Sequence, residues 1–393
     1  MQLTPELIEF IRSHEQDATD RLLLSASKYP GVEMPFVVEQ IIARQAAREK
    51  LPTWHAERRV VYPSRLAVEQ ASSEITARYK QRLLVGETAC DLTGGLGSDA
   101  YYLSRAAREM IYVERDPACC RAARDNFEVL NVANARVLRE DAGNVAGTVA
   151  VDTFYIDPSR RTKENKRVFT LADCEPDALQ LKPLLLERAR RVIVKCSPML
   201  DIVETLHFFP ECEEVHVLAV KNECKELLLI LGKEYRPGQA ILHAVNITAG
   251  AEQRLSFTRQ EEQEAVPEQA TVVRAFLYEP NSALLKAGAF KTVATRFRVE
   301  KLHPRGNLYT SDNLITDFPG RIFAADEVVD FSGKALKLLA ARYPKANITA
   351  RNFTLPVAAL REKSGIKEGG DVHLFATTLA GRGGVLLLCH KVV

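Results

Sequence analysis

Apolar residues recur at intervals of three and four through the first 82 residues of the chain. The pattern is clearest in "PELIEFIRSH", "PFVVEQIIARQAAREKLP" and "PSRLAVEQASSEITARYKQRLL". This spacing places apolar side chains on one face of an α-helix, and Pro30-Gly31 and Pro52 separate the helical stretches. We therefore predict an N-terminal helical region over residues 1–82.

From about residue 86 the pattern changes to short apolar runs that alternate with helical stretches. The runs are "TACDLT", "MIYVER", "ARVLRED", "VDTFYID", "RRVIVKC", "EVHVLAV" and "ELLLILG". Continuous apolar runs of this kind are typical of parallel strands buried on both faces, so residues 83–235 are predicted to form a doubly wound, Rossmann-like α/β sheet. Only "KNECK" separates the last two runs, which is too short for a parallel crossover. We expect these two strands to be an antiparallel pair at the end of the sheet.

The remaining residues, 236–393, mix strand and helix patterns in a looser order. "RIFAADEVVDF", "DVHLFATTLA" and "GGVLLLCHKV" are typical of strands, and "PNSALLKAGAFKTVATRF" and "GKALKLLAARYP" of helices. The sequence thus predicts a C-terminal α+β domain.

Composition narrows the class of protein. A chain of 393 residues with 46% hydrophobic residues exceeds the about 250–300 residues of one core, so we expect two or three domains. The net charge of +2 means that a nucleic acid would need a local basic patch. No apolar run approaches the about 20 residues of a membrane span, and the acidic, amphipathic start does not resemble a signal peptide. The scattered cysteines suit a reducing, cytoplasmic setting without membrane contact, and the histidine spacings predict no metal site.

The stretch "CDLTGGLGSDA", residues 90–100, joins a predicted strand to a predicted helix. Glycines permit positive φ and a close approach of a ligand, and a helix start presents backbone N–H groups. By itself the loop is consistent with a tight turn or with a cofactor cradle. The order Asp91-x-Thr93-x-Gly95-x-Gly97 fits neither a nucleotide P-loop nor the G-x-G-x-x-G of dinucleotide-binding proteins.

Acidic residues end the first four predicted strands: Asp91, Glu114, Asp141 and Asp157. In an open α/β sheet, ligands bind at the carboxyl ends of the strands. An acid at the position of Glu114 binds ribose hydroxyls in both NAD and S-adenosylmethionine sites. The four acids therefore predict a ligand site at this edge of the sheet.

With these motifs, residues 64–232 resemble a class I S-adenosylmethionine-dependent methyltransferase. Its first motif is an acid followed by alternating glycines, and Thr93 stands where many members have the first glycine. The resemblance implies that the glycine loop holds the methionine part of the cofactor, Glu114 the ribose, and Asp141 with Ala142 the adenine. The implied cofactor residues are Asp91, Thr93, Gly94, Gly95, Gly97, Glu114, Arg115, Asp141 and Ala142.

The helix predicted before the first strand borders the cofactor pocket in related methyltransferases. Gln70 and Ser73 would share one face of it at i, i+3. They are therefore added to the cofactor candidates. The alternative is that they cap and solvate a packing helix.

Asp157-Pro158-Ser159-Arg160 follows the fourth predicted strand and resembles the Asn/Asp-Pro-Pro-aromatic motif of amine methyltransferases. There the acid or amide accepts hydrogen bonds from an exocyclic NH2 group, and the aromatic ring stacks on the base. The guanidinium of Arg160 can stack in the place of the ring, and an acid favours guanine N2. These are the candidate catalytic residues, with Lys195 and Ser197 lining the pocket. Alternatively, the turn contacts the cofactor only.

The whole chain resembles a bacterial group of methyltransferases with a helical N-terminal part and a C-terminal THUMP-like domain. "YPSRLAVEQASSEITARYK" and "NITARNFTLPVAALREK" carry this closer match. THUMP-like domains are associated with RNA, so the resemblance implies an RNA partner. The basic run 160–167 could neutralise phosphates, as could a basic group of Lys286, Lys291, Arg296, Arg298, Lys301 and Arg305.

The function that these features predict is S-adenosylmethionine-dependent methylation of a base exocyclic amine in structured RNA, either ribosomal or transfer RNA. One alternative is a methyltransferase that acts on a protein or a small molecule. Others are a non-catalytic RNA-binding protein with this fold and a nicotinamide-dependent dehydrogenase.

Overall fold

The computed structural model describes residues 3–160, 174–236 and 238–392. The chain divides into two compact units, one of Met1–Glu213 with Leu227–Pro237 and one of Glu214–Glu226 with Gly238–Val393. The N-terminal helices thus belong to the same unit as the parallel strands, and the three-part division of the sequence remains a proposal. No helix in the described ranges combines the length and the apolar character needed to cross a membrane.

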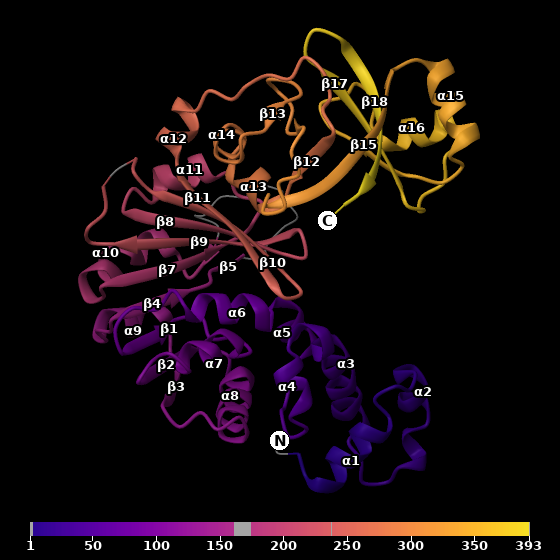
Figure 1. The fold of residues 1–393 in the computed structure, drawn as a ribbon. Helices are drawn as coiled ribbons and strands as arrows, with labels where there is room; N and C mark the ends of the chain where they lie inside the picture. Colours follow the sequence, from indigo (N-terminus) through magenta and orange to yellow (C-terminus); the bar gives the residue numbers. More distant parts are fainter. Residues whose placement is uncertain (1–2, 161–173, 237, 393) are drawn as a thin grey trace. The chain divides into compact units, whose positions relative to one another are not determined.

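Most of residues 5–81 are helical, as their pattern predicts (Figure 1). Proline at the first helical positions and side-chain caps such as Thr4 and Ser64 start several of these helices. Ile11, Leu22, Val37 and Ile41 form an apolar cluster among them. The helices are α1 Pro5–Ser13, α2 Thr19–Leu24, η1 Ala26–Lys28, α3 Met34–Lys50, α4 Pro52–Ala56, α5 Arg65–Gln70 and α6 Glu74–Gln81.

Five parallel strands follow, and their order reverses at the first of them. Strand β1 lies between β2 and β4, and it pairs with both in parallel. Such a reversal creates the crevice where ligands bind in open α/β sheets. The strands are β1 Thr88–Asp91, β2 Glu109–Glu114, β3 Ala135–Arg139, β4 Thr153–Ile156 and β7 Arg191–Cys196, and the helices are α7 Ser98–Ser104, α8 Pro117–Val129, α9 Ala142–Thr148, α10 Ala178–Arg188 and α11 Ile202–Phe208.

The antiparallel end predicted for this sheet is confirmed in part. Strand β9 (Glu223–Gly232) runs antiparallel to β7, and β8 (Cys212–Val220) is its other neighbour. Lys221 and Asn222 both have positive φ, as a type I′ hairpin turn requires. The pair does not end the sheet, however, because β10 (Ile241–Thr248) and β11 (Ala251–Thr258) continue the strand order beyond β8. The sequence analysis missed β11 because this edge strand is mostly polar and has no apolar run.

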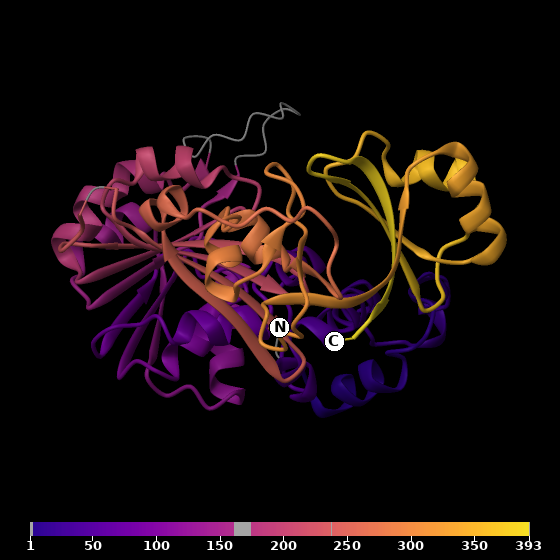
Figure 2. The ribbon, with the colours of Figure 1, turned by 45° about the horizontal axis from the view of Figure 1, so that its top comes forward.

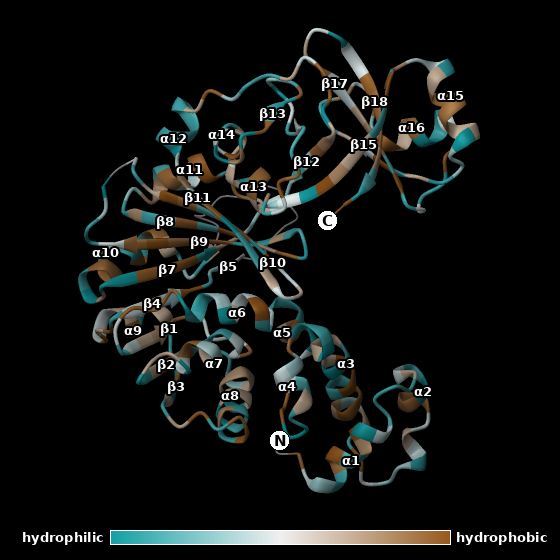
Figure 3. Ribbon diagram, viewed as in Figure 1, coloured by the Kyte–Doolittle hydropathy of each residue, from teal (hydrophilic) through white to brown (hydrophobic). Residues whose placement is uncertain are grey.

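The strand order of the full nine-stranded sheet is β11-β10-β8-β9-β7-β4-β1-β2-β3. Apolar residues follow its central strands (Figure 3). Val192, Ile193 and Ile230 are fully buried there, as expected for strands covered on both faces. This rigid layer carries the residues that follow the ends of β1, β2 and β4.

The C-terminal residues form the α+β fold that the sequence predicts, with the strands and helices that are orange and yellow in Figure 2. Their sheet has the order β13-β14-β12-β15-β18-β17-β16. Leu386 and Leu388 pack under α15 and α16, whereas Val385 and Leu387 face a second apolar cluster. Alternate residues of the run "VLLLC" thus point to opposite faces of the strand and pack into two separate apolar clusters. The elements are α12 Arg259–Glu264, β12 Phe276–Pro280, α13 Ser282–Ala287, α14 Thr292–Phe297, β13 Glu300–Lys301, β14 Tyr309–Ser311, β15 Gly320–Asp330, α15 Gly333–Arg342, β16 Asn347–Ala350, α16 Val357–Ser364, β17 Val372–Leu379 and β18 Gly383–Lys391.

Candidate functional site

The glycine loop after β1 is packed tightly against β2. The N–H of Gly94 donates to the carbonyl of Val113 at 2.8 Å, and a Cβ at Gly94 would lie 2.2 Å from the ring of Tyr112. Gly95 and Gly97 have φ of 52° and 94°, which glycine adopts without strain. The loop is therefore restricted to glycine at Gly94 by space and at the other two positions by backbone conformation.

Glu114 ties this loop to the end of β2. One carboxylate oxygen accepts the N–H of Gly95 at 2.9 Å, and the other accepts those of Arg115 and Asp116, both at 2.8 Å. The side chain of Arg115 pairs instead with Glu175, at 2.5 Å between Nη1 and Oε1. Glu114 thus lies at the loop, as predicted, whereas Arg115 contributes to it through its backbone.

Asp91 is buried at the end of β1, and only one of its two carboxyl oxygens has a hydrogen bond to the described residues. Oδ1 accepts the N–H of Thr93 at 2.9 Å, with the Thr93 hydroxyl at 3.3 Å. Oδ2 is buried without a hydrogen bond to the described residues. Burial raises the pKa of Asp91 well above its usual value, and the carboxylates of Asp99 and Asp157 add to this rise. A buried acceptor of this kind fits a cationic ligand.

Asp157 follows β4 and is held from two neighbouring strands. Its N–H donates to the Thr93 hydroxyl at 2.7 Å, and its Oδ2 accepts from the Lys195 ammonium at 2.6 Å. Burial raises the pKa of Asp157, and the Lys195 charge opposes that rise. The structure therefore brings together Asp91, Thr93, Asp157 and Lys195, which the sequence analysis had placed separately on three strands.

A buried network that no sequence motif indicates lies beside these acids. The ammonium of Lys80, fully buried on α6, donates to Ser72 at 2.6 Å and pairs with Asp99 at 2.9 Å. Asp99 also accepts from the hydroxyls of Ser72 and Tyr155, at 2.7 and 2.8 Å. Burial would raise the pKa of Asp99, but the ammonium groups of Lys80 and Lys195 outweigh it and hold that pKa below its usual value.

One sequence signal could have found Lys80. It lies three residues after Ala77 and four after Thr76, both buried, so it occupies the covered face of α6. A lysine at such a position needs a buried acid. The identity of that acid depends on the tertiary structure.

The helix on which the sequence analysis placed Gln70 and Ser73 is interrupted. Helix α5 ends at Gln70, and Ser73 caps the start of α6 by accepting the N–H of Thr76 at 3.3 Å. The prediction of one shared helical face is therefore wrong. Gln70 is exposed, and Ser72, between the two helices, makes the contacts to Lys80 and Asp99.

The remaining candidates lie at the ends of β3 and β4. Asp141 is exposed and caps α9 through the N–H of Gly143 at 2.8 Å, with Ala142 buried behind it. The Ser159 hydroxyl donates to the carbonyl of Glu175 at 3.3 Å, in the short pairing of β5 (Ser159–Arg160) with β6 (Cys174–Glu175). The basic run 160–167 lies outside the described residues from Arg161 onward.

Three members of the C-terminal basic group make contacts within the fold or are buried in it. The single helix predicted over "PNSALLKAGAFKTVATRF" is wrong, because Gly288, with φ of 79°, ends α13 before α14 begins. Arg296 pairs with Glu261 at 3.0 Å, the Lys291 ammonium donates to the Gln263 carbonyl at 3.1 Å, and Lys301 is buried. These three cations therefore make contacts within the protein or are buried in it.

A group of possible metal ligands, which the histidine spacing did not indicate, lies on β8 and β10. Glu214 Oε2 lies 2.9 Å from His216 Nε2 and 3.3 Å from His243 Nε2. The Nδ1 atom of His243 contacts Ser256 at 2.7 Å and Arg254 at 2.9 Å. The ring atoms of His243 thus have hydrogen-bonding partners on both sides, and we assign no metal to this cluster.

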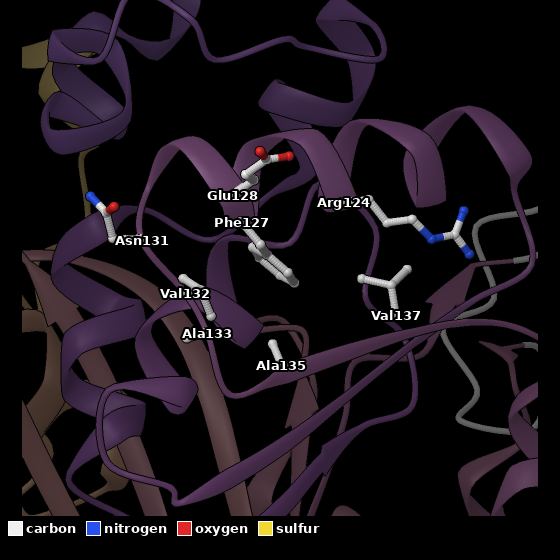
Figure 4. A pocket seen from close by; sticks show the side chains of 8 residues that line it. All are labelled: Arg124, Phe127, Glu128, Asn131, Val132, Ala133, Ala135 and Val137. Carbon is white, nitrogen blue, oxygen red and sulfur yellow. The ribbon is translucent and has the colours of Figure 1, made fainter.

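A hollow of about 560 Å³ lies between α8 and β3 (Figure 4). Its floor is Phe127, whose ring packs edge-on against Tyr112. Ala133 and Ala135 line it at the start of β3, the opposite end from the strand-terminal acids. The Phe127 ring also lies 3.4 Å from the position of a Cβ at Gly97, so the hollow adjoins the glycine loop on the α8 side.

The buried Asp91 predicts a pH dependence of stability. Because its pKa is raised on folding, the folded protein binds this proton more tightly than the unfolded chain. The resulting stabilisation is complete below the unfolded value of about 3.9 and is lost as the pH rises through the folded pKa. As the pH rises above the unfolded value, we expect the free energy of unfolding to fall more steeply in the wild type than in Asp91→Asn. Denaturant titrations measure this, and parallel pH profiles would contradict it.

Two domain families match the C-terminal part of the chain. Residues 276–319 match a ferredoxin-like domain, and residues 320–391 match a THUMP domain-like family. Together these matches cover β12 to β18.

Relatives cover the whole chain. A crystal structure described as that of a "putative methyltransferase from Porphyromonas gingivalis W83" is 35% identical, with 100% of each chain covered and a TM-score of 0.90. An uncharacterized S-adenosylmethionine-dependent methyltransferase of Mycobacterium tuberculosis is 28% identical over 347 residues, 85% of this chain and 89% of the relative. Ribosomal RNA small subunit methyltransferase J of Shewanella piezotolerans is 34% identical over 137 residues, which cover 28% of this chain and 50% of that protein.

Proposed function

Because the chain belongs to the class I S-adenosylmethionine-dependent methyltransferases with a C-terminal THUMP-like domain, we propose that it methylates an exocyclic base amine of structured RNA. We favour guanine N2 as the target atom. The observation that carries this proposal is Asp157, a carboxylate held by Thr93 and Lys195 beside the glycine loop.

The residues at the carboxyl ends of β1 and β2 fit this cofactor. Asp91 Oδ2 is a buried acceptor without a partner among the described residues, and Gly94 leaves no room for a side chain. S-adenosylmethionine supplies an electrophilic methyl group when bound. In our proposal the loop from Gly94 to Gly97 holds its methionine part, Glu114 accepts from the ribose hydroxyls, and Asp141 with Ala142 borders the adenine.

Asp157 has the chemistry needed for an amine. An ionised carboxylate only accepts hydrogen bonds, so it orients an NH2 group with its lone pair directed away from the carboxylate. This contribution is positioning and charge stabilisation, not covalent catalysis. In our proposal Asp157 also takes the proton that the nitrogen loses after methylation. Pro158 fixes the turn, and Arg160 is proposed to stack on the base.

RNA is the partner that the relatives and the C-terminal domain favour. The THUMP-like match supports RNA binding by residues 236–393, and one partial relative is named for ribosomal RNA. Residues 83–235 would then carry the methyl transfer, with the N-terminal helices packed beside them. All eight cysteines are free, which fits our further proposal of a cytoplasmic protein.

Comparing modified nucleosides tests the proposal. RNA from cells that contain the protein should carry a methylated base amine that is missing without the gene, and the purified protein with labelled S-adenosylmethionine should restore it. Ribonuclease treatment of the substrate before the assay should abolish labelling. Labelling that survives ribonuclease would replace RNA by a protein or small-molecule substrate, and an absence of cofactor binding in calorimetry would refute the activity.

A further inference from the structure

Thr93 stands in a position where the family often has glycine, and its hydroxyl joins two acids. Oγ1 accepts the N–H of Asp157 at 2.7 Å and lies 3.3 Å from Asp91 Oδ1. Strands β1 and β4 are parallel neighbours, and Thr93 and Asp157 follow their ends. One hydroxyl thus links the acid of the glycine motif to the acid proposed to bind the target amine. A glycine would lack this link.

Lys195 fixes the same acid from the other side. It lies on β7, the next parallel strand after β4, and its ammonium is 2.6 Å from Asp157 Oδ2. The side chains are 14% and 33% exposed, so solvent screens the pair only in part. Oδ1 has no hydrogen bond to a described residue. The arrangement therefore fixes the backbone and one carboxylate oxygen of Asp157 and leaves the other oxygen for a ligand.

The charge state of Asp157 decides what that oxygen can bind. An ionised carboxylate accepts hydrogen bonds only, whereas a protonated carboxyl also donates one. Burial raises the pKa of Asp157 and favours protonation, and the ammonium of Lys195 counteracts this effect. Among the described residues, the other charged groups near the site are Asp91, Asp99, Lys80 and Glu114, and the Cys196 thiol is a neighbouring titratable group.

We propose that Thr93 and Lys195 are positioning residues that keep Asp157 in place as an acceptor-only carboxylate. The site then selects a target atom that carries hydrogen, such as an exocyclic amine, over a ring nitrogen that has only a lone pair. This inference rests on the proposed function and adds the residues that determine its target class.

The first test is the pH profile of Lys195 variants. An opposite charge at this distance lowers the pKa of an aspartate by about 1–3 units, so in Lys195→Met the acidic limb of kcat should move to higher pH by at least about one unit. Lys195→Arg keeps the charge and should restore most of the wild-type profile. The control is Lys182→Met, because Lys182 is 13% exposed and pairs with Glu211 at 2.7 Å outside the site. Its profile should match that of the wild type.

The second test concerns the Thr93 hydroxyl. Thr93→Val leaves the Asp157 N–H without its acceptor, and we expect kcat to fall about 10–100-fold. Thr93→Ser should recover most of the activity. Thr88→Val is a matched control, because Thr88 accepts the N–H of Asp152 at 2.9 Å at the opposite end of β1 and β4. It should lose stability but keep kcat.

A titration without RNA separates this inference from the proposed function. In protein labelled with ¹³C at aspartate carboxyl carbons, the Asp157 signal is assigned by its loss in Asp157→Asn. Its midpoint should rise by at least about one pH unit in Lys195→Met and return toward the wild-type value in Lys195→Arg. An unchanged midpoint would overturn the inference even if the protein methylates RNA. A shifted midpoint in a protein that methylates no amine would support the positioning role and refute the proposed target.

Discussion

Replacing Asp157 by alanine is expected to lower methyl transfer about 10²–10³-fold and to leave the affinity for S-adenosylmethionine within about threefold. The carboxylate follows β4 and contacts Thr93 and Lys195, whereas the glycine loop is held by Glu114 and Val113. Removing the Asp157 side chain therefore deletes the acceptor for the target amine without releasing the loop. Single-turnover transfer to RNA from cells lacking the protein, and calorimetry with the cofactor, measure the two effects.

Two further variants sharpen this test. Asp157→Asn keeps one oxygen acceptor but places an NH2 group or a neutral oxygen against the Lys195 ammonium, so we expect an intermediate loss of transfer. Asp152→Asn changes a carboxylate at the other end of β1 and β4, where it accepts from Glu87 and Thr88, and should keep kcat. Wild-type transfer by Asp157→Ala would exclude Asp157 as the amine acceptor.

Replacing Glu114 by alanine is expected to weaken S-adenosylmethionine binding at least about a hundredfold, because charge-assisted hydrogen bonds contribute about 1.5–3 kcal/mol each. The loss has two sources. The variant has no acceptor for the ribose, and it frees the N–H groups of Gly95, Arg115 and Asp116 that shape the loop. Titration calorimetry with S-adenosylmethionine and S-adenosylhomocysteine measures the effect, with circular dichroism to confirm folding.

Two further variants serve as controls for the expected loss of cofactor affinity in Glu114→Ala. Glu114→Gln retains an oxygen acceptor and should bind the cofactor with an affinity between the wild type and Glu114→Ala. Glu109→Ala is the matched change at the opposite end of β2, where Glu109 is exposed and pairs with Arg108. It should bind the cofactor as the wild type does. If Glu114→Ala retained wild-type affinity, the cofactor site proposed at β2 would be wrong.

The parallel strands and the acids that follow them could be predicted from the sequence alone. Asp91, Glu114 and Asp157 are each adjacent in sequence to an apolar run. A short apolar run that alternates with helical stretches is typical of a strand in a sheet covered on both faces. The sequence also predicted that β9 is antiparallel to the strand before it, because the five residues between the two apolar runs are too few for a parallel crossover connection. The run "VLLLC" likewise predicted a strand, and the structure showed that its alternate residues pack into two apolar clusters. These features depend on neighbours within about ten residues.

The contacts that define the site needed the tertiary structure. Thr93 meets Asp157 from 64 residues away, and Lys80 meets Asp99 across two elements, because strand register and helix packing place them together. The spacing of apolar residues along the chain does not indicate which distant residues will contact one another. The break after Gln70 and the polar edge strand β11 were missed for a related reason. Ser72, at the break, bonds to Lys80 and Asp99, and β11 pairs with β10. The sequence by itself determined which strand ends carry acids, and only the tertiary structure decided which hydroxyl and which lysines hold them, because local patterns specify secondary structure while hydrogen bonds between distant residues depend on how that structure packs.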